Sequence, residues 1–188
     1  MKNVVLFASG SGSNVENIVS YFKDDPTFKV SIILCNNPKA YVLERAKNNN
    51  ISALTFNRAA FYEEDHVLNL LKSTAPDLIV LAGFLWKFPE NIIREFNNKI
   101  INIHPALLPK YGGKGMYGSH VHNAVVANKE SKSGITIHYV NENYDDGAII
   151  FQAECDVLPE DTANDVANKV HTLEYEYFPK IIEKLLNE

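Results

Sequence analysis

The sequence has little of the features that define secreted, metal-clustered or membrane proteins. Its 188 residues include only two cysteines, Cys35 and Cys155, too few for a disulfide framework or a zinc cluster. Both lie in apolar, strand-like runs, so we expect two buried thiols. No apolar run approaches the ~20 residues of a membrane span, and the N-terminus shows no signal-peptide pattern. These absences favour a cytoplasmic protein with no membrane partner.

An excess of charge of one sign is also missing. The formal net charge is -5, from 18 Lys and Arg against 23 Asp and Glu. This balance argues against nucleic acid as the main partner, whereas a local site for a small anion is compatible with it. The length fits a single α/β domain covering residues 1–188.

Apolar runs of strand length alternate with helical patterns in the first half of the chain. Strands are expected at 4–8, 30–34, 53–56, 78–82 and 100–103. Helices are expected at 38–47 and 90–96 and around the apolar residues of 15–22 and 67–71. This order predicts a Rossmann-like, mostly parallel twisted sheet with helices on both faces, in which 4–8 is a central strand.

The last part of the chain has a different pattern. Apolar and polar residues alternate over 135–140 and 149–157, which predicts two half-buried strands, antiparallel or at a sheet edge. Thr162 and Asp165 have the spacing of a capping box and begin a long helix. Pro179 should kink this helix. Its expected buried stripe consists of Val166, Val170, Leu173, Ile181 and Leu185.

A glycine-rich loop, Ser-Gly-Ser-Gly-Ser-Asn at 9–14, joins the first strand to the first helix. A dinucleotide fingerprint would need glycine where Val15 stands and an acidic residue near 34–37, which reads Leu-Cys-Asn-Asn. The pattern therefore favours a single phosphate on the free N–H groups of Gly12, Ser13 and Asn14. A capped turn with no ligand is the alternative.

A strand ends in the sequence Asn102-Ile103-His104-Pro105. Asn102 and His104 point to the same side because side chains alternate along a strand. Asn can donate to a developing oxyanion, and a protonated His can donate to it or transfer a proton. Asp145 lies in an Asp-Asp-Gly turn, which is either hairpin chemistry or the source of a carboxylate that keeps His104 charged.

The other histidines are weaker candidates. His120 and His122 resemble a metal pair but have too few partners, so no metal is expected. His138 points to the opposite face of its strand from Ile137 and could line the same cleft as His104. His171 and Glu174 share one face of the last helix, which is either solvated or functional.

These motifs resemble the folate-dependent phosphoribosylglycinamide formyltransferases of purine biosynthesis over essentially the whole chain. The resemblance lies in residues 9–14, 81–84, 102–111, 134–138 and 145–147. It implies an enzyme that transfers the formyl group of 10-formyltetrahydrofolate to the amine of 5-phosphoribosylglycinamide. Its partners would then be small molecules, and we expect a monomer or a weak homodimer.

The resemblance also implies a role for each site residue. Those expected to hold the substrate's 5′-phosphate are Gly12, Ser13 and Asn14. Those expected to contact the ribose hydroxyls are Glu174 and His171. Those expected to frame the folate, with the turn near Asp145, are Leu85, Trp86, Lys87, Phe88 and Asn102. The expected catalytic set is Asn102, His104 and Asp145.

In the implied mechanism the substrate amine attacks the formyl carbon. Asn102 and protonated His104 stabilise the tetrahedral oxyanion, and His104 with a water held by Asp145 moves the amine proton to the leaving nitrogen. These steps need no metal ion and no covalent enzyme intermediate.

The chain departs from the family pattern in two places. Trp86 stands where some relatives carry an arginine, and Glu63 and Glu64 stand near the position of another. Those arginines would meet the glutamate tail of the folate, which leaves Lys87 or Lys114 as candidates here. The glycine-rich segment 112–118 is either a mobile flap beside the site or a long surface loop.

Three other functions compete with this one. Relatives that formylate the initiator methionyl-tRNA or a sugar nucleotide, or that hydrolyse formyl-folate, carry extra domains for which 188 residues leave no room. A non-catalytic nucleotide- or folate-binding module would explain the glycine loop but not Asn102, His104 and Asp145 together. A nicotinamide-dependent oxidoreductase does not fit Val15.

Overall fold

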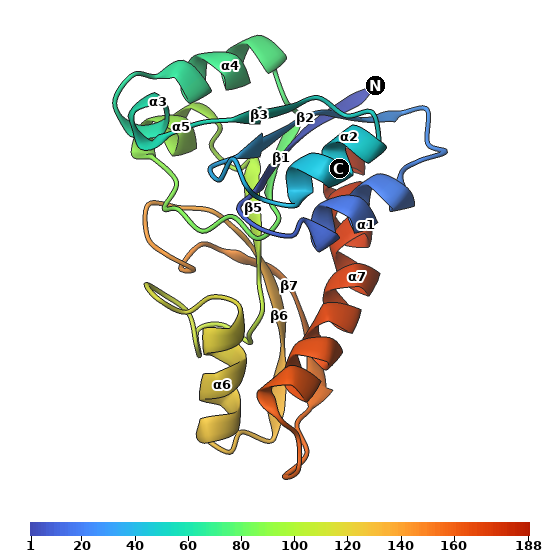
Figure 1. Ribbon diagram of the computed structural model, residues 1–188, viewed down its shortest axis with the longest axis vertical. Coiled ribbons are helices and arrows are strands. Elements are labelled where there is room, and N and C mark those ends of the chain that lie inside the picture. The colour runs from blue at the N-terminus through green and yellow to red at the C-terminus, as the bar shows by residue number, and fades with distance from the viewer.

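The computed structural model describes residues 1–188 as one seven-stranded sheet flanked by helices (Figure 1). The strands are β1 (Lys2–Ala8), β2 (Phe28–Cys35), β3 (Ala53–Thr55), β4 (Leu78–Leu81), β5 (Ile100–His104), β6 (Lys132–Tyr139) and β7 (Ile149–Asp156). The helices are α1 (Ser13–Tyr21), α2 (Val42–Asn48), α3 (Arg58–Tyr62), α4 (His66–Thr74), α5 (Glu90–Glu95), α6 (Ser119–Ala127) and α7 (Ala163–Asn187).

The strand order across the sheet is β3-β2-β1-β4-β5-β6-β7. Strands β1 to β5 pair in parallel, and β6 and β7 continue the sheet as antiparallel strands. The prediction of a mostly parallel sheet with an antiparallel C-terminal strand pair is therefore confirmed. Strand β1 is interior, as expected, and β4 is the middle strand.

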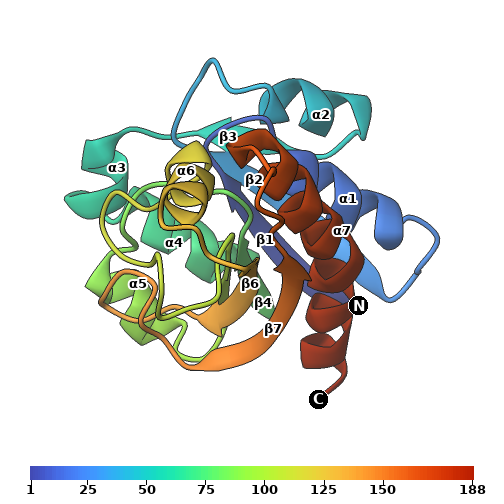
Figure 2. The ribbon, with the colours of Figure 1, turned by 90° about the horizontal axis from the view of Figure 1, so that it is seen from below.

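Both faces of the sheet carry an apolar core. A cluster of 27 buried residues lies beneath α1, α2, α6 and α7, and a cluster of 15 lies beneath α3, α4 and α5. Figure 2 shows α1 and α7 on one side of the sheet and α4 and α5 on the other. Because both faces are covered, the central strands are continuously apolar, and Val4 to Phe7 are fully buried.

Strand β6 differs from its predicted half-buried form. Its residues from Ser133 to His138 are buried on both faces. The edge strand β7 alternates as predicted only from Phe151 onward, because Ile149, at its start, is exposed. The segment after β5 covers the polar face of β6: Leu108 N donates to Thr136 Oγ1 at 3.0 Å, and that hydroxyl donates to Ala106 O at 2.7 Å. The alternating pattern correctly predicted which face of β6 is polar. This face can be buried because its polar groups form hydrogen bonds within the protein.

Some local predictions are wrong at the level of single elements. Helix α2 begins at Val42, four residues later than expected, and α3 and α6 were not predicted. Helix α3 has only five residues and is fixed by its cap, where Ala60 N donates to Asn57 Oδ1 at 2.9 Å. Five residues are too few to show a helical period. Cys35 is buried, but Cys155 is only half-buried because it lies on the edge strand β7.

Helix α7 begins with the predicted capping box of Thr162 and Asp165 and contains Pro179. Its buried stripe is Val166, Val170, Glu174, Phe178, Pro179, Ile182 and Leu186. The predicted members Leu173, Ile181 and Leu185 are only half-buried. A strict four-residue spacing runs along the core side, and it places the carboxyl group of Glu174 among buried positions.

The loops after β1 and β4 are tied together at the carboxyl ends of the parallel strands. Ser9 N donates to Gly83 O at 3.0 Å, and Leu85 N donates to Ser9 Oγ at 3.0 Å. The chain turns to opposite sides of the sheet after these two adjacent strands. Such a switch point opens a crevice in α/β folds, where ligands bind.

Candidate active site

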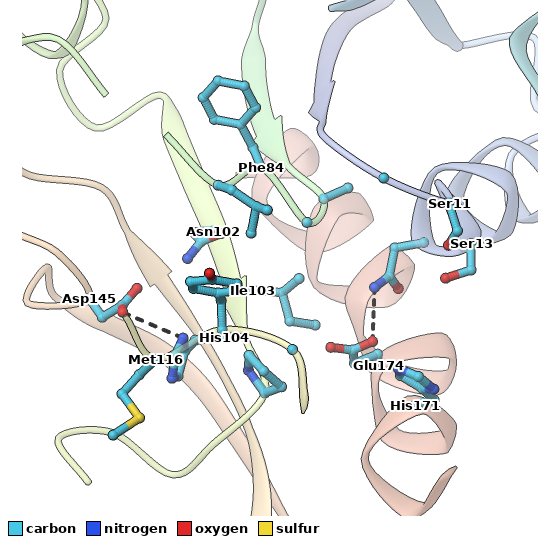
Figure 3. A pocket seen from close by; sticks show the side chains of 18 of the residues that line it. Ser11, Ser13, Phe84, Asn102, Ile103, His104, Met116, Asp145, His171 and Glu174 are labelled. Carbon is cyan, nitrogen blue, oxygen red and sulfur yellow. Dashed lines mark hydrogen bonds and ion pairs between the residues drawn. The ribbon is translucent and has the colours of Figure 1, made fainter. Parts of the chain in front are cut away.

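A cavity of about 540 Å³ lies in this crevice. It is lined by the loops after β1 and β4, the end of β5, the glycine-rich segment before α6, and residues of α6 and α7 (Figure 3). A smaller cavity of about 60 Å³ adjoins it. The two share Phe84, Asn102, Tyr144 and Asp145 as lining residues. Sequence segments that are far apart thus meet at one edge of the sheet.

The glycine loop presents free main-chain N–H groups to the larger cavity. The N–H groups of Gly12, Ser13 and Asn14 have no acceptor within the protein. Gly12 has a φ of 74°, and a Cβ there would lie 2.4 Å from Val42 Cγ2, so only glycine fits. Arg45 Nε donates to Ser11 O at 2.9 Å and holds the loop from outside. Unpaired N–H groups at a helix N-terminus suit an anion.

Glu174 faces the glycine loop from α7. Its Oε2 accepts from Asn14 Nδ2 at 2.9 Å, and the residue is 6% exposed. Burial raises the pKa of the Glu174 carboxyl, against smaller opposing effects of the Asn14 hydrogen bond and of His171. Asn14 Oδ1 is buried without a partner. Asn14 and Glu174 therefore form a polar pair where the loop meets α7, and this pair can form hydrogen bonds with the hydroxyl groups of a ligand.

Two histidines, His171 and His122, line the same cavity as Glu174. His171, one turn earlier on α7, is exposed and lines the cavity. His122 of α6 is buried, its ring centroid lies 6.5 Å from that of His171, and its Nδ1 has no partner. Burial, followed by the charges of His171 and His104, lowers the pKa of His122 to about 4. His122 thus presents a neutral imidazole, a role that the sequence, which suggested only a metal pair, did not indicate.

His104 lies between two acceptors. Its Nε2 is 2.7 Å from Tyr111 O, and its Nδ1 is 3.5 Å from Asp145 Oδ2. A carbonyl oxygen only accepts, so Nε2 carries a proton. His104 is buried, and it is among the residues that line the larger cavity. The expected pairing of His104 with Asp145 is present in the geometry (Figure 3).

Asn102 is oriented by His138. Asn102 Nδ2 donates to His138 Nε2 at 3.2 Å, while His138 Nδ1 donates to Tyr139 O at 2.9 Å. Burial lowers the pKa of His138, although the Tyr139 carbonyl and Asp145 act in the opposite direction. His138 is therefore neutral and accepts one N–H of Asn102. The other N–H of the amide is left for a ligand.

The residues expected to frame the folate divide between the two cavities. Leu85 lines the larger one and is 50% exposed, whereas Trp86, Lys87 and Phe88 line the smaller one. Phe88 belongs mainly to the core, since it is 4% exposed and packs edge-on against other rings.

Arg58 was not singled out in the sequence but lies beside this region. Its guanidinium carbon is 4.7 Å from the centre of the Trp86 ring, a cation–π distance. Lys87 and Lys114 line the smaller and the larger cavity respectively. The site therefore has cations near its mouth without arginine at position 86.

The glycine-rich segment lies beside the site. Gly113 N donates to Asp145 Oδ2 at 2.9 Å, and residues 113–118 line the larger cavity. A Cβ on Gly112 would lie 2.6 Å from Leu108 Cδ2 and 3.3 Å from Asp145 Cβ. The absence of a side chain at this position lets the segment pack against the acidic turn.

Two structural findings concern other classes of site. None of the helices is both long and apolar enough to cross a membrane. No group of three or more His, Cys, Asp or Glu side chains has an arrangement that could hold a metal ion.

The fold and the site define a Rossmann-like α/β protein with an anion loop and an Asn–His–Asp group in one crevice. The sequence matches the family model described as formyl transferase over residues 2–182, and the chain belongs to this family. It is 35% identical to a phosphoribosylglycinamide formyltransferase of Bacillus subtilis, covering 99% of this chain and 95% of that one.

Other relatives agree with this assignment. The chloroplastic phosphoribosylglycinamide formyltransferase of Vigna unguiculata is 36% identical over 100% of this chain, which spans 62% of the plant protein's length. The crystal structure of glycinamide ribonucleotide transformylase 1 from Geobacillus kaustophilus superposes with a TM-score of 0.89 at 33% identity, covering 99% of each chain. The predicted family and fold are therefore confirmed.

Proposed function

We propose that this chain transfers the formyl group of 10-formyltetrahydrofolate to the amine of 5-phosphoribosylglycinamide. The products would be formylglycinamide ribonucleotide and tetrahydrofolate. The observation that carries the proposal is one cavity that joins an anion loop to the Asn102, His104 and Asp145 group. Relatives named for this activity support it along the whole chain.

The phosphorylated substrate would bind between the loop after β1 and α7. The free N–H groups of Gly12, Ser13 and Asn14 would hold its phosphate. Glu174 and His171 line the next part of the cavity and would accept or donate to the ribose hydroxyls. Its amine would then point towards the end of β5.

The folate would approach from the opposite side. Leu85 and the smaller cavity beside Trp86, Lys87 and Phe88 offer apolar and aromatic surface for a pterin ring. Asn102 and Asp145 line both cavities and His104 lines the larger one, so a formyl group at this junction would be near all three side chains.

In the reaction the neutral amine forms a bond to the formyl carbon, and the carbonyl electrons move to oxygen. The free N–H of Asn102 and a proton on His104 would stabilise this oxyanion, and one such donor is typically worth about 10²–10³ in rate. Asp145, through a water, would help His104 carry the amine proton to the folate nitrogen as its bond to carbon breaks.

A non-catalytic binding module is the alternative from another class. It would need the anion loop and the folate surface, but it would give no reason for a buried histidine between a carboxylate and a carbonyl. Binding of both ligands without turnover, measured by calorimetry, would favour it.

The direct test is purified protein with both substrates, followed by the release of tetrahydrofolate. His104→Ala and Asp145→Asn should lower turnover by at least about 100-fold, while calorimetry shows that both substrates still bind. His66→Ala, at a side chain that is 69% exposed, is the matched control and should keep wild-type turnover. A folded wild type without formyl transfer would refute the proposal.

We further propose that the chain works as one domain in the cytoplasm, as a monomer or weak homodimer, and binds no nucleic acid. The net charge of -5 supports the last point. Light scattering across a concentration series tests the oligomeric state, cell fractionation the location, and a gel-shift assay with tRNA the absence of nucleic-acid binding.

A further inference from the structure

The Nε2 atom of His104 forms a hydrogen bond with a residue outside the expected catalytic set. Tyr111, seven positions along the chain, supplies its main-chain carbonyl to Nε2 at 2.7 Å. Because this bond requires a proton on Nε2, a neutral His104 ring has its lone pair on Nδ1. Nδ1 is then the nitrogen that takes up and releases a proton, beside Asp145 Oδ2.

The carbonyl of Tyr111 is held in a conformation that needs support. Tyr111 has a φ of 56°, in the left-handed region, which costs a residue other than glycine roughly 1–2 kcal/mol. An unsupported loop would relax from this conformation and turn the carbonyl away from His104.

The side chain of Tyr111 supplies that support from the far end of α6. Its hydroxyl donates to Glu130 Oε1 at 2.9 Å and accepts from Asn128 Nδ2 at 3.0 Å. Lys110 Nζ also contacts Glu130, at 3.0 Å. The ring itself packs against the larger apolar cluster. The two hydrogen bonds of the hydroxyl and the packing of the ring therefore hold the Tyr111 side chain in place.

The same short segment fixes the second partner of His104. Two residues after Tyr111, Gly113 N donates to Asp145 Oδ2, the oxygen nearest to His104 Nδ1. Asp145 is itself left-handed, with a φ of 53°. A displacement of Tyr111 would thus disturb both acceptors of the imidazole at once.

We propose that Tyr111, anchored through its hydroxyl to Glu130 and Asn128, is a positioning residue that holds the proton of His104 on Nε2 and leaves Nδ1 to exchange protons in the reaction. The effect on the reaction rests on the proposed function, whereas the effect on the ring does not.

Tyr111→Phe tests the inference because it removes only the hydroxyl. It should lower kcat about tenfold, since a small misplacement of a catalytic group is costly, and leave both KM values within about twofold. In ¹⁵N spectra of the ligand-free protein, the His104 signal, assigned by its loss in His104→Gln, should show Nε2 protonated at every pH in wild type. In Tyr111→Phe the neutral ring should become a mixture of both tautomers.

Variants of Glu130 provide a second, independent measurement. Glu130→Gln keeps an acceptor oxygen and should retain most of kcat and the single tautomer, whereas Glu130→Ala should resemble Tyr111→Phe. If Tyr111→Phe does not fold, the Glu130 pair decides. The matched control is Tyr21→Phe, because Tyr21 OH donates to Glu183 Oε2 at 2.6 Å on the surface between α1 and α7.

Wild-type kcat and an unchanged His104 signal in both Tyr111→Phe and Glu130→Ala would overturn the inference, even if the melting temperature fell. A folded wild type without formyl transfer would refute the proposed function instead. The spectra of the ligand-free protein would then still decide whether Tyr111 positions the ring.

Discussion

Three of the histidines that line the two adjoining cavities, His104, His122 and His138, have different surroundings. His104 has an acceptor at each nitrogen, whereas His138 and His122 lie where burial favours the neutral ring. A neutral His138 can accept from Asn102 and thereby orient its amide. The three side chains are of the same type, so their different roles follow from their different surroundings.

Protonation of His122 should make the stability of the protein depend on pH. Its pKa is about 4 in the folded chain against 6.5 for an unperturbed histidine. Between these values the unfolded state binds more protons, so its contribution is complete above pH 6.5 and is lost as the pH falls towards 4. Glu174, with a raised pKa, acts in the opposite direction, since its contribution is lost as the pH rises above 4.5.

We therefore expect His122→Gln to lose less stability than wild type between pH 7 and pH 5, as measured by urea unfolding at each pH. His66→Gln, on the surface, should follow wild type. Equal losses in wild type and His122→Gln would contradict the assigned neutral state of His122.

Arg58 lies over Trp86, which lines the smaller cavity, and it is a candidate beside Lys87 and Lys114 to meet an acidic extension of a bound folate. Arg58→Met should weaken binding of a polyglutamylated folate several-fold and leave a pteridine without glutamate almost unaffected. Fluorescence titration measures both, with Arg94→Met on α5 as an exposed control. Equal affinities of wild type and Arg58→Met for the polyglutamylated ligand would exclude the role.

Two parts of the candidate site, the anion loop and His104, lie at the ends of strands. β1 ends in the anion loop and β5 ends in His104, whereas Glu174 lies in the middle of α7, in its buried stripe. Each end leaves main-chain or side-chain groups free because the regular hydrogen bonds stop there. The rigid sheet then fixes the distance between the anion loop and the imidazole of His104.

Gly12→Ala should damage the start of α1. The left-handed φ of 74° and a Cβ placed 2.4 Å from Val42 Cγ2 force the loop or α2 to move, at a cost of about 1–3 kcal/mol. We expect the KM for the phosphorylated substrate to rise about tenfold and that for the folate to change little. Gly10→Ala, with no atom within 4 Å of its added Cβ, should keep wild-type stability. An unchanged KM in Gly12→Ala would contradict the assigned phosphate loop.

The whole molecule consists of two apolar clusters joined by one sheet. The strands contribute side chains to both clusters, so neither cluster can persist when the sheet separates. This arrangement predicts one folding unit for residues 1–188.

Unfolding in urea should therefore be a single transition. Trp86, the one tryptophan, reports by fluorescence on the smaller cluster, and circular dichroism reports mainly on the helices, of which α7 is the longest. The two curves should coincide. Separate midpoints would show that the two faces unfold independently and that the chain is not one unit.

The sequence alone determined the alternation of strands and helices, the glycine loop, the capping box of α7 and the shared direction of Asn102 and His104. These features depend on residues near one another in the chain, whose periods and propensities act locally. For the same reason the family could be inferred from short motifs.

Only the tertiary structure decided the rest. It buried both faces of β6, paired Glu174 with Asn14 across 160 positions, and placed Tyr111 and His122 near His104. Such contacts join segments that are distant in the sequence. The burial of these groups, which no local sequence pattern shows, determines which site side chains hold a proton and which can exchange one.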